Sequence, residues 1–131
     1  MKLYNLILFT CLFVFISSIF SQTWVSPSSR PQVETPIAIN PTNPNNLIGT
    51  AITQFGVTES QISYYYSFNG GQSWTGVDNI SGTGNDAGDP VIVFDPDGVA
   101  YLLYQVRDDN ELYLHKSSDG GITWSGRIQL L

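Results

Sequence analysis

Short runs of apolar or alternating residues, separated by turn-forming residues, fill the chain after residue 22. None of these runs has helical spacing over a length that would predict a helix. They predict strands at residues 35–39, 47–53, 62–67, 91–94, 99–106 and 111–116, with weaker candidates at 74–80 and 124–131. The intervening segments are rich in Asn, Asp, Pro and Gly, which favour turns. We therefore expect an all-β chain in which short antiparallel strands follow one another as a meander.

The first 21 residues follow a different pattern. Lys2 is followed by an apolar run over residues 6–16, interrupted only by Thr10, and then by small and polar residues up to Ser21. Such a pattern is typical of a secretory signal peptide, whereas a transmembrane helix needs roughly 20 apolar residues. We expect cleavage near Ser21, which predicts a secreted or cell-surface protein with no transmembrane segment after cleavage. The alternative is a buried N-terminal helix.

Charge and cysteine content narrow the class of protein further. The 131 residues include 5 Lys or Arg against 11 Asp or Glu, which gives a net charge of −6. This balance leaves no basic surface to displace counterions from a polyanion, so we expect no nucleic-acid partner. The only cysteine, Cys11, lies in the predicted signal peptide. Without a disulfide, the exported chain must depend on packing and hydrogen bonds.

The three tryptophans mark an internal repeat. They stand at positions 24, 74 and 124, with a constant spacing of 50 residues, and each follows a Ser or Thr. Residues 62–74 match residues 112–124 without a gap, and residues 34–41 match residues 89–96 at an offset of 55. A repeat of about 50 residues that contains four short strands is typical of a propeller blade.

The repeat is clearest at a hairpin motif of the form Ser-x-Asp-x-Gly-x-Thr-Trp. The second copy meets the motif in full with Ser117, Asp119, Gly121, Thr123 and Trp124. The first copy differs twice and consists of Ser67, Asn69, Gly71, Ser73 and Trp74. This motif resembles the Asp-box, or BNR repeat, of sialidase-like (neuraminidase-type) β-propellers. The resemblance implies four-stranded blades in a six-bladed ring, of which this chain would supply about two.

A structural role accounts for every residue type in the box. Asp or Asn accepts hydrogen bonds from backbone N–H groups of the turn, Ser and Thr bind the same loop, and the glycine allows the positive φ of a tight turn. The tryptophan supplies apolar packing surface. We therefore expect these ten residues to be structural, and we expect no cofactor or metal. A calcium site at Asp95, Asp97 and Asp119 is the alternative, although calcium needs 6–8 oxygen ligands.

The repeat also divides the chain into parts. The expected parts are a signal peptide at 1–21, a strand closing the last blade at 22–32, a first blade at 33–80 with its box at 67–74, and a second, truncated blade at 81–131 with its box at 117–124. Two blades leave open sheet edges. We therefore expect an N-terminal fragment whose closure needs the remaining blades, and assembly of several short chains into a ring is the alternative.

In a four-stranded blade, the loop between the third and fourth strands, which carries the box, lies at one end. The loop between the second and third strands lies at the other end. Binding residues are expected opposite the boxes, and the candidates are Glu34, Asp86, Asp89, Arg107 and Asp108. We expect His115, the only histidine, to be an ordinary strand residue.

The resemblance implies a glycoside hydrolase of exo-α-sialidase type that acts on glycoconjugates. Such an enzyme needs an arginine cluster, an Asp acid/base and a Tyr–Glu pair. Arg30, Arg107 and Arg127 are the only arginines, and their surroundings do not match this set. Catalytic residues are therefore expected to lie largely outside this chain, which would be inactive alone. The alternative is a non-catalytic secreted or cell-surface propeller that binds glycans or proteins.

Overall fold

The computed structural model describes residues 23–26, 28–81, 86–107 and 110–130. Among them every regular element is a strand, and all ladders between the strands are antiparallel. The predicted all-β class is confirmed. The expected signal peptide at 1–21 and the candidate residue Asp108 lie outside the described residues.

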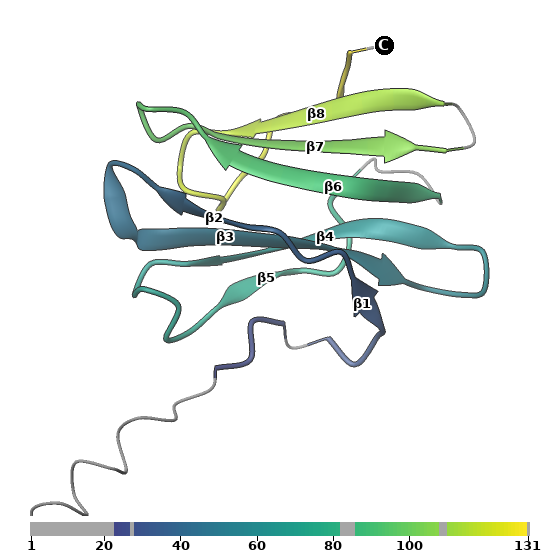
Figure 1. Cartoon of the computed structure of the whole chain (residues 1–131), viewed down its shortest axis with the longest axis horizontal. Helices are drawn as coiled ribbons and strands as arrows, with labels where there is room; N and C mark the ends of the chain where they lie inside the picture. The colour runs from purple at the N-terminus through teal and green to yellow at the C-terminus, as the bar shows by residue number, and fades with distance from the viewer. Residues whose placement is uncertain (1–22, 27, 82–85, 108–109, 131) are drawn as a thin grey trace, which may run out of the picture.

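The first sheet contains five strands (Figure 1). They are β1 (Gln32–Val33), β2 (Ile37–Asn40), β3 (Asn43–Gln54), β4 (Ser60–Ser67) and β5 (Thr75–Val77). The strand order is β1-β3-β4-β5, and β2 also pairs with β3. β1 and β2 therefore act together as one interrupted edge strand. Two details differ from the sequence-based expectation: β1 was not predicted, and β3 begins at Asn43, inside the segment expected to be a turn.

The second sheet contains four strands in the order β6-β7-β8-β9. They are β6 (Ala87–Phe94), β7 (Ala100–Val106), β8 (Glu111–Ser117) and β9 (Ile128–Gln129). Alternating apolar and polar residues put one face of each strand into the interior. In β7, for example, alternate residues are buried from Ala100 to Val106.

The sequence repeat is also a repeat of strand register. Ser67 of the first box pairs with Leu47, which is the first residue of the apolar part of β3. Ser117 of the second box pairs in the same way with Ala100, the first residue of β7. The first strands of the two repeats, β2 and β6, show the same correspondence, because Ile37 of β2 pairs with Gly49 and Ile92 of β6 pairs with Leu102. The pairs β2–β3 and β3–β4 of the first sheet therefore correspond in register to β6–β7 and β7–β8 of the second.

The two inner edge strands are interrupted at corresponding positions. Glu34, between β1 and β2, and Asp89, within β6, both have φ of 52°. The β6–β7 register shifts between Gly88 and Val91, which marks a β-bulge. Left-handed backbone is uncommon for non-glycine residues, so its recurrence shows that the repeat extends to local backbone shape.

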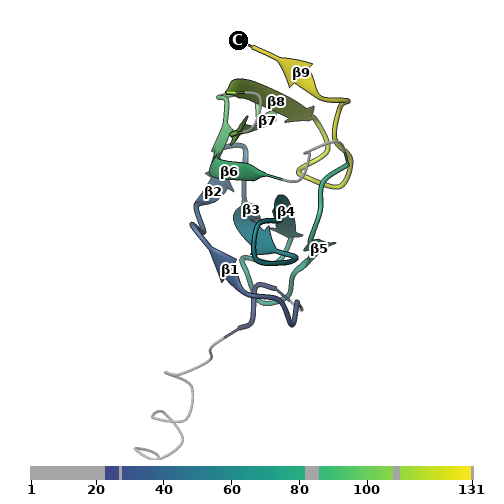
Figure 2. The ribbon, with the colours of Figure 1, turned by 90° about the vertical axis from the view of Figure 1, so that its right-hand side faces the viewer.

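The two sheets stack face to face, with β6 lying nearest the first sheet (Figure 2). The buried core between and within them is Ile48, Ile52, Ile62, Ile80, Ala87, Ile92, Ala100, Leu102, Tyr104, Val106 and Tyr113. Burial of one such large apolar side chain contributes about 1.5–3 kcal/mol. Stacking therefore stabilises both sheets, while the outer face of each sheet is left without a second sheet over the described residues.

Candidate functional site

The first box closes the hairpin between β4 and β5 with side-chain hydrogen bonds. Asn69 Oδ1 accepts from the Ser67 hydroxyl at 2.8 Å and from the Ser73 backbone N–H at 2.9 Å. Ser67 Oγ accepts from the Gly71 N–H at 2.9 Å, and the Trp74 indole N–H donates to the Gly71 carbonyl at 3.0 Å. The polar groups of the box are thus directed at its own turn.

The second box repeats this arrangement between β8 and the segment that leads to β9. Asp119 Oδ1 accepts from the Ser117 hydroxyl at 2.8 Å and from the Thr123 N–H at 2.9 Å, and Ser117 Oγ accepts from the Gly121 N–H at 2.9 Å. Desolvation acts to raise the pKa of Asp119, but the hydrogen bonds from Thr123 and Ser117 outweigh it and hold the pKa below its usual value. A carboxylate held in this way suits a structural anion, not a proton donor.

The surroundings of the two boxes differ because only the second box lies against a neighbouring sheet. The Trp124 ring meets the ring of Tyr64, from the first sheet, edge to face at a centroid distance of 5.5 Å. Trp74 instead lies near Gly49 on the other face of the first sheet, where no further sheet is present among the described residues. Trp124 therefore packs between two sheets, whereas Trp74 lies on a face of the first sheet that no other sheet covers among the described residues.

Asn46 ties the two boxes together at this end of the molecule. Its side chain is fully buried, and its Nδ2 donates to the carbonyls of Ser67 at 3.2 Å and of Gly120 at 3.0 Å. Its Oδ1 accepts from Asn40 Nδ2 at 3.0 Å. The two boxes and the turn that precedes β3 thus gather at one end of the molecule.

At the opposite end of β3, a small hollow forms between the two sheets. This loop hollow, about 120 Å³ in volume, is lined by Gln54, residues 56–60, Asp86 and Arg107. Arg107 Nη1 lies 3.6 Å from Asp86 Oδ1, and the Arg107 N–H donates to the Asp86 carbonyl at 3.0 Å. Ser60 Oγ donates to the Ala87 carbonyl at 2.8 Å. The hollow therefore joins the second-to-third loop of one repeat to the start of the next.

The absence of a side chain at Gly88 sets the place of the Arg107 guanidinium. A Cβ at this position would lie 2.6 Å from Arg107 Nη2, which is closer than van der Waals contact. Arg107 can lie over β6 only because the residue beneath it is glycine.

The structure brings together only part of the predicted binding face. Asp86 and Arg107 meet in the loop hollow. Glu34 and Asp89 are exposed, each has a positive φ, and neither lines the hollow. Glu59, in the loop between β3 and β4, also lines the hollow.

The three arginines are held apart by different partners. The Arg30 guanidinium lies 4.2 Å from the centroid of the Phe55 ring, and that of Arg127 lies 4.0 Å from the centroid of the Tyr113 ring. Arg107 faces Asp86. Since the arginine clamp of a sialidase needs three guanidinium groups around one carboxylate, these residues do not form one.

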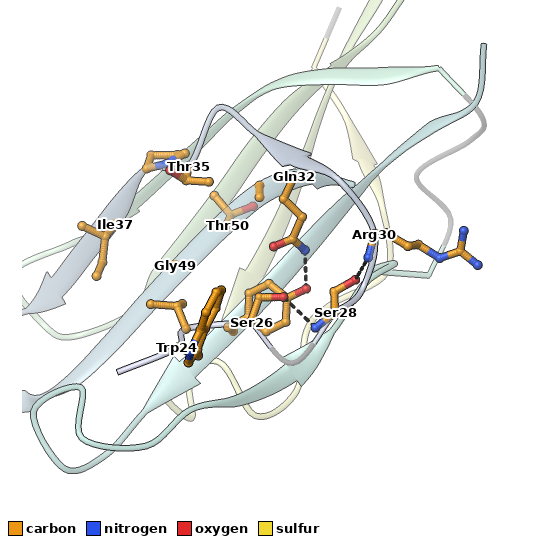
Figure 3. A pocket seen from close by; sticks show the side chains of 13 residues that line it. Trp24, Ser26, Ser28, Arg30, Gln32, Thr35, Ile37, Gly49 and Thr50 are labelled. Atoms are coloured by element: carbon orange, nitrogen blue, oxygen red, sulfur yellow. Dashed lines mark hydrogen bonds between the residues drawn. The ribbon is translucent and has the colours of Figure 1, made fainter. Parts of the chain in front are cut away.

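A larger cavity, which no sequence pattern predicted, lies on the outer face of the first sheet. This N-terminal cavity, about 490 Å³ in volume, lies between the segment from Trp24 to Ile37 and residues of β3 and β4 (Figure 3). Trp24 is 90% exposed, and residues 23–26 belong to no strand. The side chain of Arg30 points away from the other labelled residues in Figure 3. Residues 23–26 therefore cover the sheet without pairing with it.

Tyr65 forms the polar floor of the N-terminal cavity. Its hydroxyl accepts from Gln32 Nε2 at 2.6 Å and donates to Asp78 Oδ1 at 2.5 Å, while Ser28 donates to Asp78 Oδ2 at 2.7 Å. Desolvation by burial, followed by the hydrogen bond to Asp78, raises the pKa of Tyr65. This network fastens the N-terminal segment to the first sheet.

His115 lies in β8, as expected, and is 1% exposed. Its Nδ1 is 2.8 Å from the Ser125 carbonyl, and its Nε2 is 3.3 Å from the Tyr104 hydroxyl. Desolvation lowers its pKa; the Ser125 carbonyl opposes this effect, and the charge of Arg127 adds to it. The imidazole is therefore neutral in the folded protein near pH 7.

The stability of the chain is expected to fall as the pH drops below 6.5. The unfolded chain binds a proton at His115 near pH 6.5, whereas the folded chain resists protonation because its pKa is lower. The stabilisation is fully present above pH 6.5 and is lost below it by up to about 1.4 kcal/mol per pH unit. Urea unfolding at pH 7.5, 6.5 and 5.5 measures this loss, and His115→Gln should flatten the profile. A wild-type profile without slope over this range would contradict the prediction.

Among the described residues, no group of three or more His, Cys, Asp or Glu side chains is arranged to hold a metal ion. The part of the chain that is described also contains no helix long and apolar enough to cross a membrane. No family model matches the sequence, and no curated protein matches it.

Proposed function

We propose that the chain forms two consecutive blades of an exported Asp-box protein related to sialidase-like propellers, and that it contacts glycans through the loop hollow without catalysing hydrolysis alone. The observation that carries this proposal is the box itself. In both copies the glycine N–H donates to the first serine, and the N–H of Ser73 or Thr123 donates to the Asn or Asp side chain. The strands that lead into the two boxes also pair with their neighbours in the same register. Local turn chemistry and long-range pairing thus agree on one repeating unit.

The open outer face of the second sheet supports further stacking. Its exposed apolar side chains include Val91, Val93, Leu112 and Ile128. Leu112 corresponds in the repeat to Ile62, which the first sheet buries in the core against the second. Exposed apolar surface at the position of an existing interface favours contact with another sheet of the same kind.

The N-terminal segment supports the proposed role of residues 22–32 in closing a blade. It lies over the outer face of the first sheet, and Ser28 donates a hydrogen bond to Asp78, the residue that follows β5. These two residues are 50 positions apart, so the segment and β5 would be corresponding outer strands. The N-terminal cavity would then receive the inner strands of the closing blade.

The parent activity that we favour is that of a sialidase-type glycoside hydrolase, with its catalytic residues largely outside this chain. A non-catalytic glycan- or protein-binding propeller is the second candidate. The separation of the three arginines onto Phe55, Tyr113 and Asp86 favours this second candidate, since none of them is placed to share a substrate carboxylate with another.

The purified chain is expected to release no fluorophore from a fluorogenic sialoside above the buffer rate, because no arginine clamp is assembled. It is expected to be retained on a surface of immobilised mixed glycans. Sialoside turnover that disappears in Arg107→Gln would contradict the expected inactivity. Failure of the folded chain to bind any glycan would overturn the proposed contact.

A further inference from the structure

The loop hollow carries more negative than positive charge. Among the described residues that line it, Arg107 is the only Lys or Arg, whereas Asp86 and Glu59 each contribute a carboxylate. The chain as a whole has a net charge of −6, so the surrounding field has the same sign. An acidic ligand would meet two like charges for each opposite one, which opposes its binding.

The hollow also places hydrogen-bond donors beside acceptors. The side chain of Arg107 is 51% exposed and that of Asp86 is 24% exposed, so both can reach a ligand. A guanidinium group has five N–H donors, and a carboxylate only accepts. The 3.6 Å ion pair between them is longer than a good charged hydrogen bond, so a ligand hydroxyl would add bonds without displacing a strong one.

A sugar hydroxyl both donates and accepts, and adjacent hydroxyls on a pyranose ring match a donor next to an acceptor. The carboxylate of an acidic sugar can only accept, and Asp86 and Glu59 offer it nothing to accept. We propose that the loop hollow binds the edge of a neutral pyranose through two adjacent hydroxyls, one accepting from Arg107 and the other donating to Asp86. This proposal rests on the glycan contact of the proposed function, and it favours the non-catalytic candidate, because a sialidase acts on an acidic sugar.

The size of the hollow limits how much of the sugar it can hold. Its volume of about 120 Å³ is below the roughly 300–1,000 Å³ that encloses a whole small ligand. One edge of a single ring therefore lies inside and the remainder lies in solvent. Binding by the chain alone is expected in the millimolar range, on the order of 1 mM.

The test is an NMR titration of the purified chain with three methyl glycosides: of galactose, of mannose and of N-acetylneuraminic acid. We expect at least one neutral glycoside to bind, and the acidic glycoside to bind at least about tenfold more weakly. Arg107→Gln should weaken binding of the neutral glycoside by about tenfold or more. Asp86→Asn should also weaken binding of the neutral glycoside, and it should strengthen binding of the acidic glycoside because it removes one negative charge. Arg127→Gln is the matched control, because this arginine lies on the Tyr113 ring, and it should leave neutral-sugar binding unchanged.

Three results would overturn the inference. Tighter binding of the acidic glycoside would reverse the sugar class and leave the proposed glycan contact in place. Neutral-sugar binding that is insensitive to both Arg107→Gln and Asp86→Asn would place the sugar elsewhere and would also leave that contact in place. No binding of any glycoside or immobilised glycan by a folded wild-type chain would overturn the inference together with the proposed contact.

Discussion

Replacement of Asn46 with leucine is expected to lower the free energy of unfolding by about 3 kcal/mol or more. The side chain is fully buried and is bonded to Asn40 and to the carbonyls of Ser67 and Gly120. Leucine has a similar volume but leaves these three buried polar groups without their partner. Each unsatisfied buried group costs about 1–3 kcal/mol. Urea unfolding followed by tryptophan fluorescence measures the change.

The matched control for Asn46 is its neighbour Asn45, which is exposed. Asn45→Leu is expected to change the free energy of unfolding by no more than about 0.5 kcal/mol. In the second repeat the position that corresponds to Asn46 is occupied by Val99, since Val99 precedes Ala100 as Asn46 precedes Leu47. The bridge made by Asn46 is therefore not repeated at Val99. Equal effects of the two asparagine variants would show that the bridge between the boxes contributes nothing.

Gly121→Ala is expected to destabilise the chain by about 2–5 kcal/mol. Gly121 has φ of +97°, where an L-residue with a side chain pays roughly 1–2 kcal/mol. A Cβ there would also lie 2.9 Å from Cδ1 and 3.1 Å from Cγ1 of Ile48. Ile48 is fully buried and cannot move aside, so overpacking adds about 1–3 kcal/mol.

Gly71→Ala is the matched control for Gly121→Ala. Gly71 occupies the same position in the first box, with φ of +86°, but its nearest neighbour would be Trp74 Cζ2 at 3.5 Å, an ordinary contact. Its expected cost is the backbone term alone, about 1–2 kcal/mol. The difference between the two alanine variants isolates the contact between the second box and the first sheet. Equal costs would show that this contact does not constrain the hairpin.

Strand positions were accessible from the sequence because they depend on local alternation. β4, β7 and β8 lie within two residues of their predicted bounds. β1 was missed because two residues are too short to show a period. The start of β3 was missed because Asn43 and Pro44 have the composition of a turn, whereas pairing of Asn43 with Asn40 extends the hairpin.

The candidate site was only partly accessible. Blade topology led to Asp86 and Arg107 as members of one face, and the structure places them together. It did not lead to the N-terminal cavity, because the expected closing strand is not paired over the described residues and Trp24 is exposed. No sequence pattern predicts which surface a segment without strand pairing will cover.

The sequence by itself determined the all-β class, the positions of most strands and the two box hairpins, since alternation and turn chemistry act within a few residues of each other. Only the tertiary structure decided which residues meet across the repeat. The bond from Asn46 to the Gly120 carbonyl joins residues 74 positions apart, and the loop hollow joins the end of β3 to the entrance of β6. Such contacts depend on how one sheet stacks on the next, and that stacking is set by the buried apolar surface of many residues together.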